Sequence, residues 1–432
     1  MRVGICGLGT VGSGVFNLVS RNASEILRKT GSSIEIAQVG CRRDHPDVEL
    51  GSTNVTRDIF EVARNPDVDV VLELIGGIDR ARELLVIALE NKKHVVTANK
   101  ALIATHGDEL FALAEKMGVQ LRYEAAIAGG IPIVKAIREG LAANRISWLA
   151  GIINGTSNFI LTEMEQSGSD LAFSEVLKQA QDLGYAEADP TFDIEGIDAA
   201  HKLTILSSIA FGVPLEFDAM YTQGISKITT EDIQYADELG YKIRHLGITR
   251  RSELGIELRV HPTLIRKEEM LAQVNGVMNA VMVSSDAAGR TMYYGAGAGA
   301  GPTASSVVAD IIDIVRGQGS PGIANLGFVN EGFVKDKTLP ILDIEDITSA
   351  CYLKLNVIDQ PGVMARLTAI LSHHKISIEA LIQKDAQGGF AAIVIVTDEV
   401  VERSMNAAIK ELESLDEVRG SVTHIRITDL QD

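Results

Sequence analysis

Two oppositely charged residues, Asp198 and Lys202, stand four positions apart in a stretch that is otherwise apolar. Residues 196–211 have the spacing of a helix, so the two side chains share one face. That face continues with the apolar residues Ile205, Leu206 and Ile209. A solvated ion pair is the ordinary interpretation of this spacing. The apolar surroundings favour burial instead, and because buried charges rarely lack a partner or a task, we expect a cleft with a functional lysine.

Four carboxylates stand in the loop that precedes this helix. They are Glu187, Asp189, Asp193 and Glu195. So many acids beside one lysine suit a ligand that carries an ammonium group, because a carboxylate accepts charge-assisted hydrogen bonds from it. A solvated acidic loop is the alternative for any one of them.

The N-terminus carries a glycine-rich turn between a predicted strand, residues 2–6, and a predicted helix. Gly7, Gly9 and Gly12 form the pattern G-x-G-x-x-G, with Thr10 and Val11 inside it. Glycines permit a tight turn and close backbone approach, and the helix then presents unpaired N–H groups to a pyrophosphate. The run therefore predicts a dinucleotide site, and a glycine-rich turn without a ligand is the alternative.

The second predicted strand, residues 34–40, is followed by Arg42 and Arg43. A site specific for NAD usually carries an acid there for the ribose 2′-hydroxyl, whereas guanidinium groups suit a 2′-phosphate. We therefore expect NADP(H) to be preferred, with NAD(H) also possible. Two arginines that only keep the surface soluble are the alternative.

Strands and helices continue to alternate, which predicts a doubly wound parallel sheet. Strands are expected over residues 67–75, 94–97 and 121–126, and a helix over 81–90. Thr97 and Lys100 follow the carboxyl end of a strand, where such sheets bind ligands. Lys100 is thus a site candidate, or an ordinary lysine that leads a helix.

A second glycine run, residues 294–302, includes Gly301 and precedes a helix predicted over 303–316. It could bring a second stretch of backbone to the cofactor, or serve as a hinge that returns the chain to the first domain.

Composition limits the class of protein. The 432 residues are 46% hydrophobic, with a net charge of −18 and a pI near 5.0. This favours two or three domains and argues against nucleic acid or an anionic membrane as partner. Cys6, Cys41 and Cys351 stand in strand-like runs and are expected to be buried, unbridged and in a reducing cytoplasm.

The chain divides into four predicted parts. Residues 1–132 form the dinucleotide domain, to which helix 303–318 returns, and residues 133–302 form an α+β domain with an antiparallel sheet between 248 and 285. Residues 319–344 are a linker. Residues 345–432 have the order βαββαβ of a ferredoxin-like module.

Six stretches together resemble homoserine dehydrogenases of the single-function type with a C-terminal ACT domain. They are GLGTVGSGV from Gly7, TANK from Thr97, EAAIAGGIPI from Glu124, NGTSNFIL from Asn154, GYAEADPTFDIEGIDAAHK from Gly184, and GAGAGAGPTASSVVADI from Gly295. The resemblance implies an α/β protein with a Rossmann domain, an α+β catalytic and dimerisation domain and an ACT domain. It also implies reversible NAD(P)H-dependent reduction of L-aspartate 4-semialdehyde to L-homoserine, toward threonine, isoleucine and methionine.

The resemblance also assigns roles to residues. Lys202 matches the proton donor to the aldehyde, Lys100 a lysine between cofactor and substrate, and Glu187 and Asp198 the positions that hold the amino acid end of the substrate. A monovalent cation site, for Na⁺ or K⁺, matches Glu124, Ile127, Gly129 and Ile131. The turn with Asp359, Gly362 and Val363 matches an effector site, most simply for threonine.

Related ACT domains pair side by side, so a homodimer or homotetramer is expected. With every catalytic candidate upstream, truncation near Pro340 is expected to leave an active enzyme that no longer responds to effector. Two other hypotheses stay open: an amino-acid-responsive regulator with a decayed dehydrogenase part, and a dehydrogenase of a related semialdehyde.

Overall fold

The computed structural model describes residues 1–168, 171–317, 339–384, 386 and 388–430. The chain forms two compact units, which are described separately. The first unit comprises Met1–Gly155, Asp198–Met220 and Val277–Leu339, and the second comprises Thr156–Ile197, Tyr221–Gly276 and Pro340–Asp432. Most of the linker expected over residues 319–344 lies outside the described residues.

The first unit contains a parallel sheet of β1 (Arg2–Cys6), β2 (Glu35–Gly40), β3 (Asn54–Thr56), β4 (Val70–Glu73), β5 (His94–Thr97) and β6 (Leu121–Arg122). The strand order is β3-β2-β1-β4-β5-β6. This is the doubly wound arrangement that the alternation predicted: strands β2 and β3 extend the sheet on one side of β1, and β4, β5 and β6 extend it on the other. Ligands in such sheets bind beyond the carboxyl ends of the strands, near the strand where the two sides meet.

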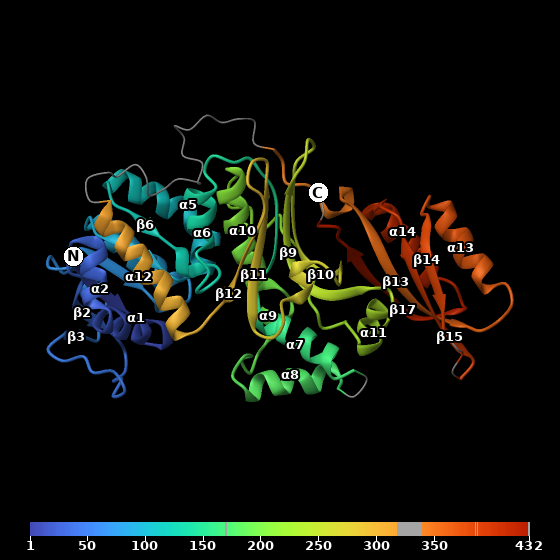
Figure 1. Cartoon of the computed structure of the whole chain (residues 1–432), viewed down its shortest axis with the longest axis horizontal. Helices are drawn as coiled ribbons and strands as arrows, with labels where there is room; N and C mark the ends of the chain where they lie inside the picture. The colour runs from blue at the N-terminus through green and yellow to red at the C-terminus, as the bar shows by residue number, and fades with distance from the viewer. Residues whose placement is uncertain (169–170, 318–338, 385, 387, 431–432) are drawn as a thin grey trace. The chain divides into compact units, whose positions relative to one another are not determined.

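Helices α1 (Thr10–Arg21), α2 (Ala23–Thr30), α3 (Ile59–Arg64), α4 (Asp79–Glu90) and α5 (Lys100–Met117) connect these strands. A much later helix, α12 (Ala300–Arg316), lies beside α1 (Figure 1). Its apolar residues, among them Val307 and Ile311, share a core with Val3 and Ile5 of β1. Close approach requires a glycine in α1, since a Cβ on Gly14 would stand 2.4 Å from the Ala300 carbonyl oxygen.

The second glycine run differs from the prediction. Strand β12 (Gly289–Ala296) includes its first residues, and α12 begins at Ala300 rather than at 303. Gly301 therefore lies in the first turn of a helix and not in an open loop. Only Gly297–Gly299 separate the strand from the helix.

The rest of the first unit joins α10 (Ile197–Phe211) to an antiparallel set of strands, in the order β12-β11-β7. These are β12, β11 (Met278–Ser285) and β7 (Ile146–Ile152). The strand expected over residues 121–126 ends at Arg122. The 3-10 turn η1 (Glu124–Ala126) follows in place of its second half. This correction has a tertiary cause, because the Glu124 carboxylate accepts the N–H groups of Val134 and Lys135 at 2.9 Å.

The second unit contains strands in the order β9-β10-β17-β13-β15-β14, and β8 (Tyr221–Thr222) pairs with β10. The first two are β9 (Tyr241–Arg251) and β10 (Ile256–Arg266), and the helices are α7 (Gly155–Gln166), α8 (Phe173–Asp182), α9 (Thr191–Ile194) and α11 (Thr230–Glu238). Residues 270–274, expected to alternate as a strand, instead include the 3-10 helix η3 (Met270–Gln273).

The C-terminal lobe has the predicted βαββαβ order. Its main elements are β13 (Thr348–Ile358), α13 (Val363–His373), β14 (Ile378–Gln383), β15 (Phe390–Thr397), α14 (Glu402–Glu413) and β17 (Val418–Ile427), with the short β16 (Val400–Val401). Both helices contribute to one apolar core with β13 and β15. The lobe is not a detached module, because β17 pairs in parallel with β10 at Thr263 and Arg426.

Candidate active site

Asp198 and Lys202 form a buried ion pair at the start of α10. Lys202 Nζ lies 2.7 Å from Asp198 Oδ2 and also donates to the Ile153 carbonyl oxygen at 2.7 Å. The Asn154 amide donates to the same carboxylate oxygen at 2.9 Å. Lys100 Nζ reaches the other oxygen, Oδ1, at 3.0 Å. One carboxylate therefore holds two ammonium groups.

The electrostatics of this cluster keep Asp198 ionised. Burial alone would raise the pKa of Asp198, but the charges of Lys202 and Lys100 outweigh it and hold the pKa well below its usual range. The helix position helps, since Asp198 is in the first turn of α10 and a negative charge there is favourable. Thirteen of the fifteen residues of α10 are buried, as its all-round apolar pattern predicted.

Lys100 reaches Asp198 from the start of α5, the helix that follows β5 of the parallel sheet. It is the first residue of α5, and Asn99 caps that helix by accepting the Leu102 N–H at 3.1 Å. The Lys100 side chain is 31% exposed, against 10% for Lys202. The two lysines therefore differ in access: one is open to solvent and the other is enclosed.

A residue that the sequence analysis missed, Glu73, organises the carboxyl end of the sheet. Its carboxylate accepts the Thr97 hydroxyl at 2.5 Å and the N–H groups of Ile75 and Gly76 at 3.0 and 3.1 Å. Burial raises the pKa of Glu73, although these hydrogen bonds oppose the change. The hydroxyl of Thr97, which was predicted to contact the cofactor, thus donates its hydrogen bond to Glu73. The signal in the sequence was an acid near the end of an apolar strand.

The glycine-rich turn lines a pocket at the ends of β1 and β2. Four of the predicted cofactor residues line this pocket: Gly7, Gly9, Arg42 and Arg43. The described lining does not include the other six, which are Thr10, Val11, Gly12, Thr97, Lys100 and Gly301. A side chain on Gly7, at φ +99°, would stand 2.6 Å from the Leu74 carbonyl oxygen. A Cβ on Gly12 would meet the Gly7 carbonyl at 2.0 Å, whereas one on Gly9 would meet no atom within 4 Å. The turn therefore leaves space for a ligand against its backbone, which fits a dinucleotide.

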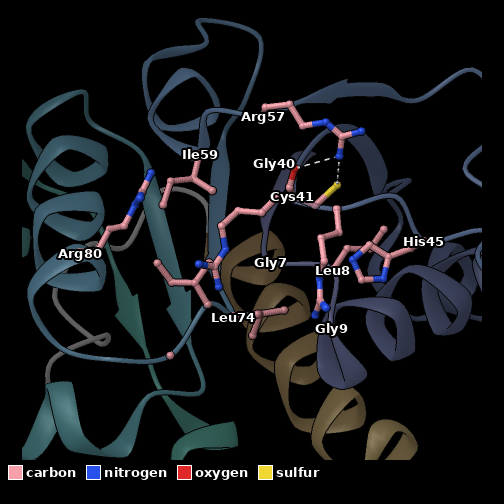
Figure 2. Close-up of a pocket in the computed structure, with 14 residues that line it drawn as sticks. Gly7, Leu8, Gly9, Gly40, Cys41, His45, Arg57, Ile59, Leu74 and Arg80 are labelled. Atoms are coloured by element: carbon pink, nitrogen blue, oxygen red, sulfur yellow. Dashed lines mark hydrogen bonds between the residues drawn. The ribbon is translucent and has the colours of Figure 1, made fainter.

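Three further basic residues line this pocket: His45, Arg57 and Arg80. Arg57 donates to the Cys41 carbonyl oxygen at 3.2 Å and pairs with Asp44, as Figure 2 shows for its bond to Cys41. Arg80 lies over the Phe60 ring at 5.5 Å. Sequence reasoning missed Arg57 and Arg80 because they stand far along the chain from both the glycine turn and the end of β2. The guanidinium groups of Arg57 and Arg80, together with those of Arg42 and Arg43, supply positive charge for phosphate groups.

The four residues of the predicted cation site lie in or beside one buried turn. The Glu124 carboxylate accepts a backbone N–H of α6 (Ile133–Lys135), and the Glu124 N–H donates to Asp310 at 2.8 Å. Burial and the neighbouring Asp310 raise the pKa of Glu124 to about 8. The Gly129 carbonyl accepts the Ser306 hydroxyl at 2.5 Å. The described residues hold no group of three or more His, Cys, Asp or Glu side chains that could bind a metal.

Glu187 belongs to the second unit, in an acidic segment that we define as residues 187–196. Its side chain is exposed, and its carbonyl accepts from the Gln181 amide at 3.0 Å. The start of α7 holds the segment, since Ser157 donates to the Asp193 carbonyl at 2.9 Å and Thr156 to the Tyr185 carbonyl at 2.7 Å. The first residues of α7 thus hold the acidic segment at Asp193 and the chain just before the segment at Tyr185.

The predicted effector turn lies before α13. Asp359 and Gly362 are exposed and Val363 is buried. Gly362 has φ +91°, a backbone conformation that glycine adopts without strain. The Val363 N–H already donates to the Gln360 carbonyl at 3.3 Å.

The three cysteines are buried and unbridged, as predicted. Among the described residues, no helix is both long and apolar enough to cross a membrane. A doubly wound sheet, a glycine turn open to a dinucleotide and a buried lysine held by a carboxylate define a nicotinamide-dependent oxidoreductase.

Comparison with known proteins identifies the family. Residues 132–312 match the family model "Homoserine dehydrogenase", residues 7–124 its NAD-binding domain, and residues 352–417 the ACT domain. The chain is 58% identical to the homoserine dehydrogenase of Pseudomonas aeruginosa, covering 100% of this chain and 99% of that protein. The chain belongs to the homoserine dehydrogenase family.

Two solved structures support this assignment. The homoserine dehydrogenase of Thiobacillus denitrificans is 52% identical, covers 100% of this chain and 98% of its own, and has a TM-score of 0.93. A hyperthermophilic archaeal homoserine dehydrogenase in complex with NADPH is 25% identical, over 72% of this chain and 97% of its own, with a TM-score of 0.62.

Proposed function

We propose that this enzyme reduces L-aspartate 4-semialdehyde reversibly to L-homoserine, in a cytoplasmic route to threonine, isoleucine and methionine. The observation that carries the proposal is the buried cluster of Asp198, Lys202 and Lys100. When bound, the reduced nicotinamide supplies a hydride. The residues of the chain must then supply a proton and hold the substrate.

Lys202 is the proton donor to the aldehyde oxygen. Its ammonium group has a defined direction, because Asp198 and the Ile153 carbonyl hold it from two sides. A positioned general acid typically contributes about 10² to 10⁴ in rate. Lys100, the more exposed of the two, lies between cofactor and substrate. Asp198 fixes both lysines and, with Glu187, binds the amino acid end of the substrate.

The cofactor preference that we propose is NADPH over NADH. Its support is the basic lining of the pocket, where Arg42, Arg43, Arg57 and Arg80 converge with the glycine turn. A 2′-phosphate adds charge that guanidinium groups bind in pairs. NADH, which lacks this phosphate, remains a weaker cofactor. Measuring both catalytic efficiencies tests this preference.

A monovalent cation, Na⁺ or K⁺, is proposed to bind backbone carbonyls of Glu124, Ile127, Gly129 and Ile131. The support is their position around one buried turn, in which Gly129 has φ +50°. Activity and thermal stability measured in NaCl, KCl and choline chloride at equal ionic strength test the site. Equal values in all three salts would contradict it.

The C-terminal lobe is proposed to bind an amino acid effector, threonine, at the turn with Asp359, Gly362 and Val363. An amino acid could place its carboxylate near the start of α13, where N–H groups and the helix dipole favour negative charge. Titration of the full chain with threonine, isoleucine, methionine and lysine tests regulation. Loss of inhibition in Asp359→Ala, with turnover retained, would locate the effector.

We further propose a homodimer or homotetramer and the domain ranges 1–132 with the returning α12, 133–302 and 345–432. Strand β14 lies at the end of the lobe's sheet order, and Leu381 on it is 39% exposed. Such an edge suits the side-by-side pairing of ACT domains. Light scattering on the purified chain tests the assembly.

The direct test of the reaction is loss of NADPH absorbance with L-aspartate 4-semialdehyde, compared with other aldehydes, and identification of homoserine as product. Turnover restricted to other aldehydes would favour a dehydrogenase of a related semialdehyde. Absence of turnover with binding of amino acids intact would favour a regulator with a decayed dehydrogenase part. The preserved lysine and carboxylate cluster argues against that last alternative.

A further inference from the structure

A buried arginine of the C-terminal lobe, Arg426 on β17, contacts residues on both sides of the junction between the lobe and the rest of the second unit. Within the lobe, its Nε donates to Glu402 at 3.0 Å, and its Nη2 makes a second bond to the same carboxylate. Outside the lobe, its Nη1 donates to Gln223 Oε1 at 2.9 Å and its Nη2 to the Tyr221 hydroxyl at 3.1 Å. The guanidinium also lies 4.7 Å from the centre of the Tyr221 ring.

The group that Arg426 holds is a short segment that begins with β8. We call residues 221–225 the β8 turn. Its backbone is tied to β10, since the Gln223 N–H donates to the Val260 carbonyl at 2.8 Å. The Gln223 carbonyl accepts from His245 Nε2 of β9 at 3.0 Å. The Arg426 side chain therefore links the lobe to the β8 turn, through its hydrogen bonds to Gln223 and Tyr221.

The β8 turn in turn packs against the end of the acidic segment. The Ile225 N–H donates to the Ile194 carbonyl at 2.8 Å. A Cβ on Gly224 would stand 2.6 Å from the Ile194 carbonyl oxygen, and one on Gly196 would stand 3.1 Å from Thr222 Cγ2. Such close backbone contacts leave the two segments little freedom to move apart.

We propose that Arg426 is a positioning residue for the acidic segment, so that the C-terminal lobe helps to shape the part of the chain that carries Glu187. The contacts run from Arg426 through Gln223 and Tyr221 to Ile194 and Glu195, all within one unit. Both charges of the central pair are buried, Arg426 at 2% exposure and Glu402 at 2%. A buried, multiply bonded guanidinium fixes geometry rather than adjusting to it.

The consequence for substrate binding rests on the proposed function, because it assigns the substrate ammonium group to Glu187. The positioning itself does not depend on that role. A movement of β17 or α14 would be transmitted to the β8 turn through Arg426. The lobe thus has a route to the acidic segment that does not involve the glycine-rich cofactor pocket.

The test removes the link without disturbing the buried pair inside the lobe. The double variant Tyr221→Phe with Gln223→Leu deletes both acceptors outside the lobe and keeps Glu402 opposite Arg426. Tyr221→Phe alone is the milder step, since it retains the ring and the Gln223 contact. Lys384→Gln is the matched control. Lys384 pairs with Glu238 of α11, so this substitution removes a different contact between the lobe and the rest of the unit.

Amide hydrogen exchange on the full-length protein without ligands is the deciding measurement. We expect exchange in the peptide covering residues 187–197 to rise by about fivefold or more in the double variant, less in Tyr221→Phe, and not in Lys384→Gln. In parallel, the KM for L-homoserine should rise while the KM for NADP⁺ stays constant and kcat changes less.

Unchanged exchange in that peptide, or an equal rise in Lys384→Gln, would overturn the positioning role. Faster exchange with an unchanged KM for L-homoserine would support the positioning role and contradict the proposed role of Glu187 in binding substrate. The two proposals therefore fail separately.

Discussion

At the scale of single residues, the two lysines of the active site are not equivalent. Both pair with Asp198, but Lys202 also donates to the Ile153 carbonyl and is the more buried. These two partners fix the direction of the Lys202 ammonium group, which suits its proposed role as proton donor. Lys100, with 31% of its side chain exposed, is the more accessible of the two lysines.

The variant Lys202→Met should lose about 10² or more in turnover while still binding NADPH. The methionine fills much of the same apolar volume, and Asp198 keeps Lys100 and Asn154 as partners. Steady-state rates and NADPH fluorescence titration measure the two effects. Lys116→Met, at an exposed position of α5, is the control. A variant that keeps more than about a tenth of wild-type turnover would show that Lys202 is not the general acid.

The arginines after β2 give a second prediction at this scale. The change Arg42→Asp with Arg43→Ala should lower the ratio of catalytic efficiencies, NADPH over NADH, by about tenfold or more. The reason is loss of the guanidinium groups that suit a 2′-phosphate. Arg28→Ala, an exposed residue of α2 paired with Glu25, is the control. An unchanged ratio would assign the 2′-phosphate to other residues, of which Arg57 and Arg80 are the first to test.

At the scale of elements, the sequence pattern correctly predicted those features that depend on residues close together in the chain. The Asp198 and Lys202 spacing is a property of one helix, so the sequence alone indicated the buried pair. The βαββαβ order of the lobe follows from periodicity and turn residues in the same way. Glu73, Arg57 and Arg80 were missed because their roles depend on strands and helices meeting in three dimensions.

The errors at this scale have the same origin. Residues 124–126 were assigned to the strand that precedes them, although Glu and Ala are poor strand formers, and η1 forms where Glu124 binds α6 through its side chain and Asp310 through its N–H. Gly301 was assigned to a loop on composition, but tertiary packing of α12 against α1 extends the helix over it. In both places tertiary contacts help to set the local structure, and at Gly301 they outweigh the intrinsic preference of glycine against a helix.

We predict that burial of Asp310, which lies on α12 against η1, makes the stability of the protein depend on pH. Burial raises the pKa of Asp310 from 3.8 to about 6, although its bond from the Glu124 N–H opposes the change. A raised pKa in the folded state stabilises the protein at low pH, and this contribution is lost as the pH rises through about 6. Asp310→Asn keeps an acceptor oxygen but cannot titrate.

Thermal unfolding of wild type and Asp310→Asn between pH 4 and 7 checks this prediction. The stability of the wild type relative to the variant should fall across this range, because only the wild type must release a proton from a buried carboxyl group. Asp47→Asn, at an exposed position, should track the wild type. A constant difference between wild type and Asp310→Asn would contradict a raised pKa.

At the scale of the whole molecule, the structure changes the expectation for truncation near Pro340. Strand β17 pairs with β10, and Lys354 and Tyr352 of the lobe bind the buried Asp232 of α11 at 2.8 and 3.3 Å. Removing the lobe would leave a buried carboxylate without these partners and expose the edge of β10.

We therefore predict that a chain ending near Pro340 unfolds at a temperature lower by about 10 °C or more, instead of remaining a stable, unresponsive enzyme. Differential scanning fluorimetry and exclusion chromatography measure the loss. Full-length Asp359→Ala should keep the wild-type unfolding temperature, since Asp359 is exposed. A truncated chain with wild-type stability and turnover would show that the lobe is an independent module after all.

Comparison of two substrates on one preparation of the full chain tests most directly whether the enzyme reduces an amino acid aldehyde. L-aspartate 4-semialdehyde and succinate semialdehyde carry the same reacting aldehyde, but only the first has an amino group, which we propose that the carboxylates of Glu187 and Asp198 bind. We predict that NADPH consumption has a kcat/KM about 10² or more higher for L-aspartate 4-semialdehyde, with L-homoserine as product. Equal efficiency with both aldehydes, or no NADPH consumption with L-aspartate 4-semialdehyde, would contradict it.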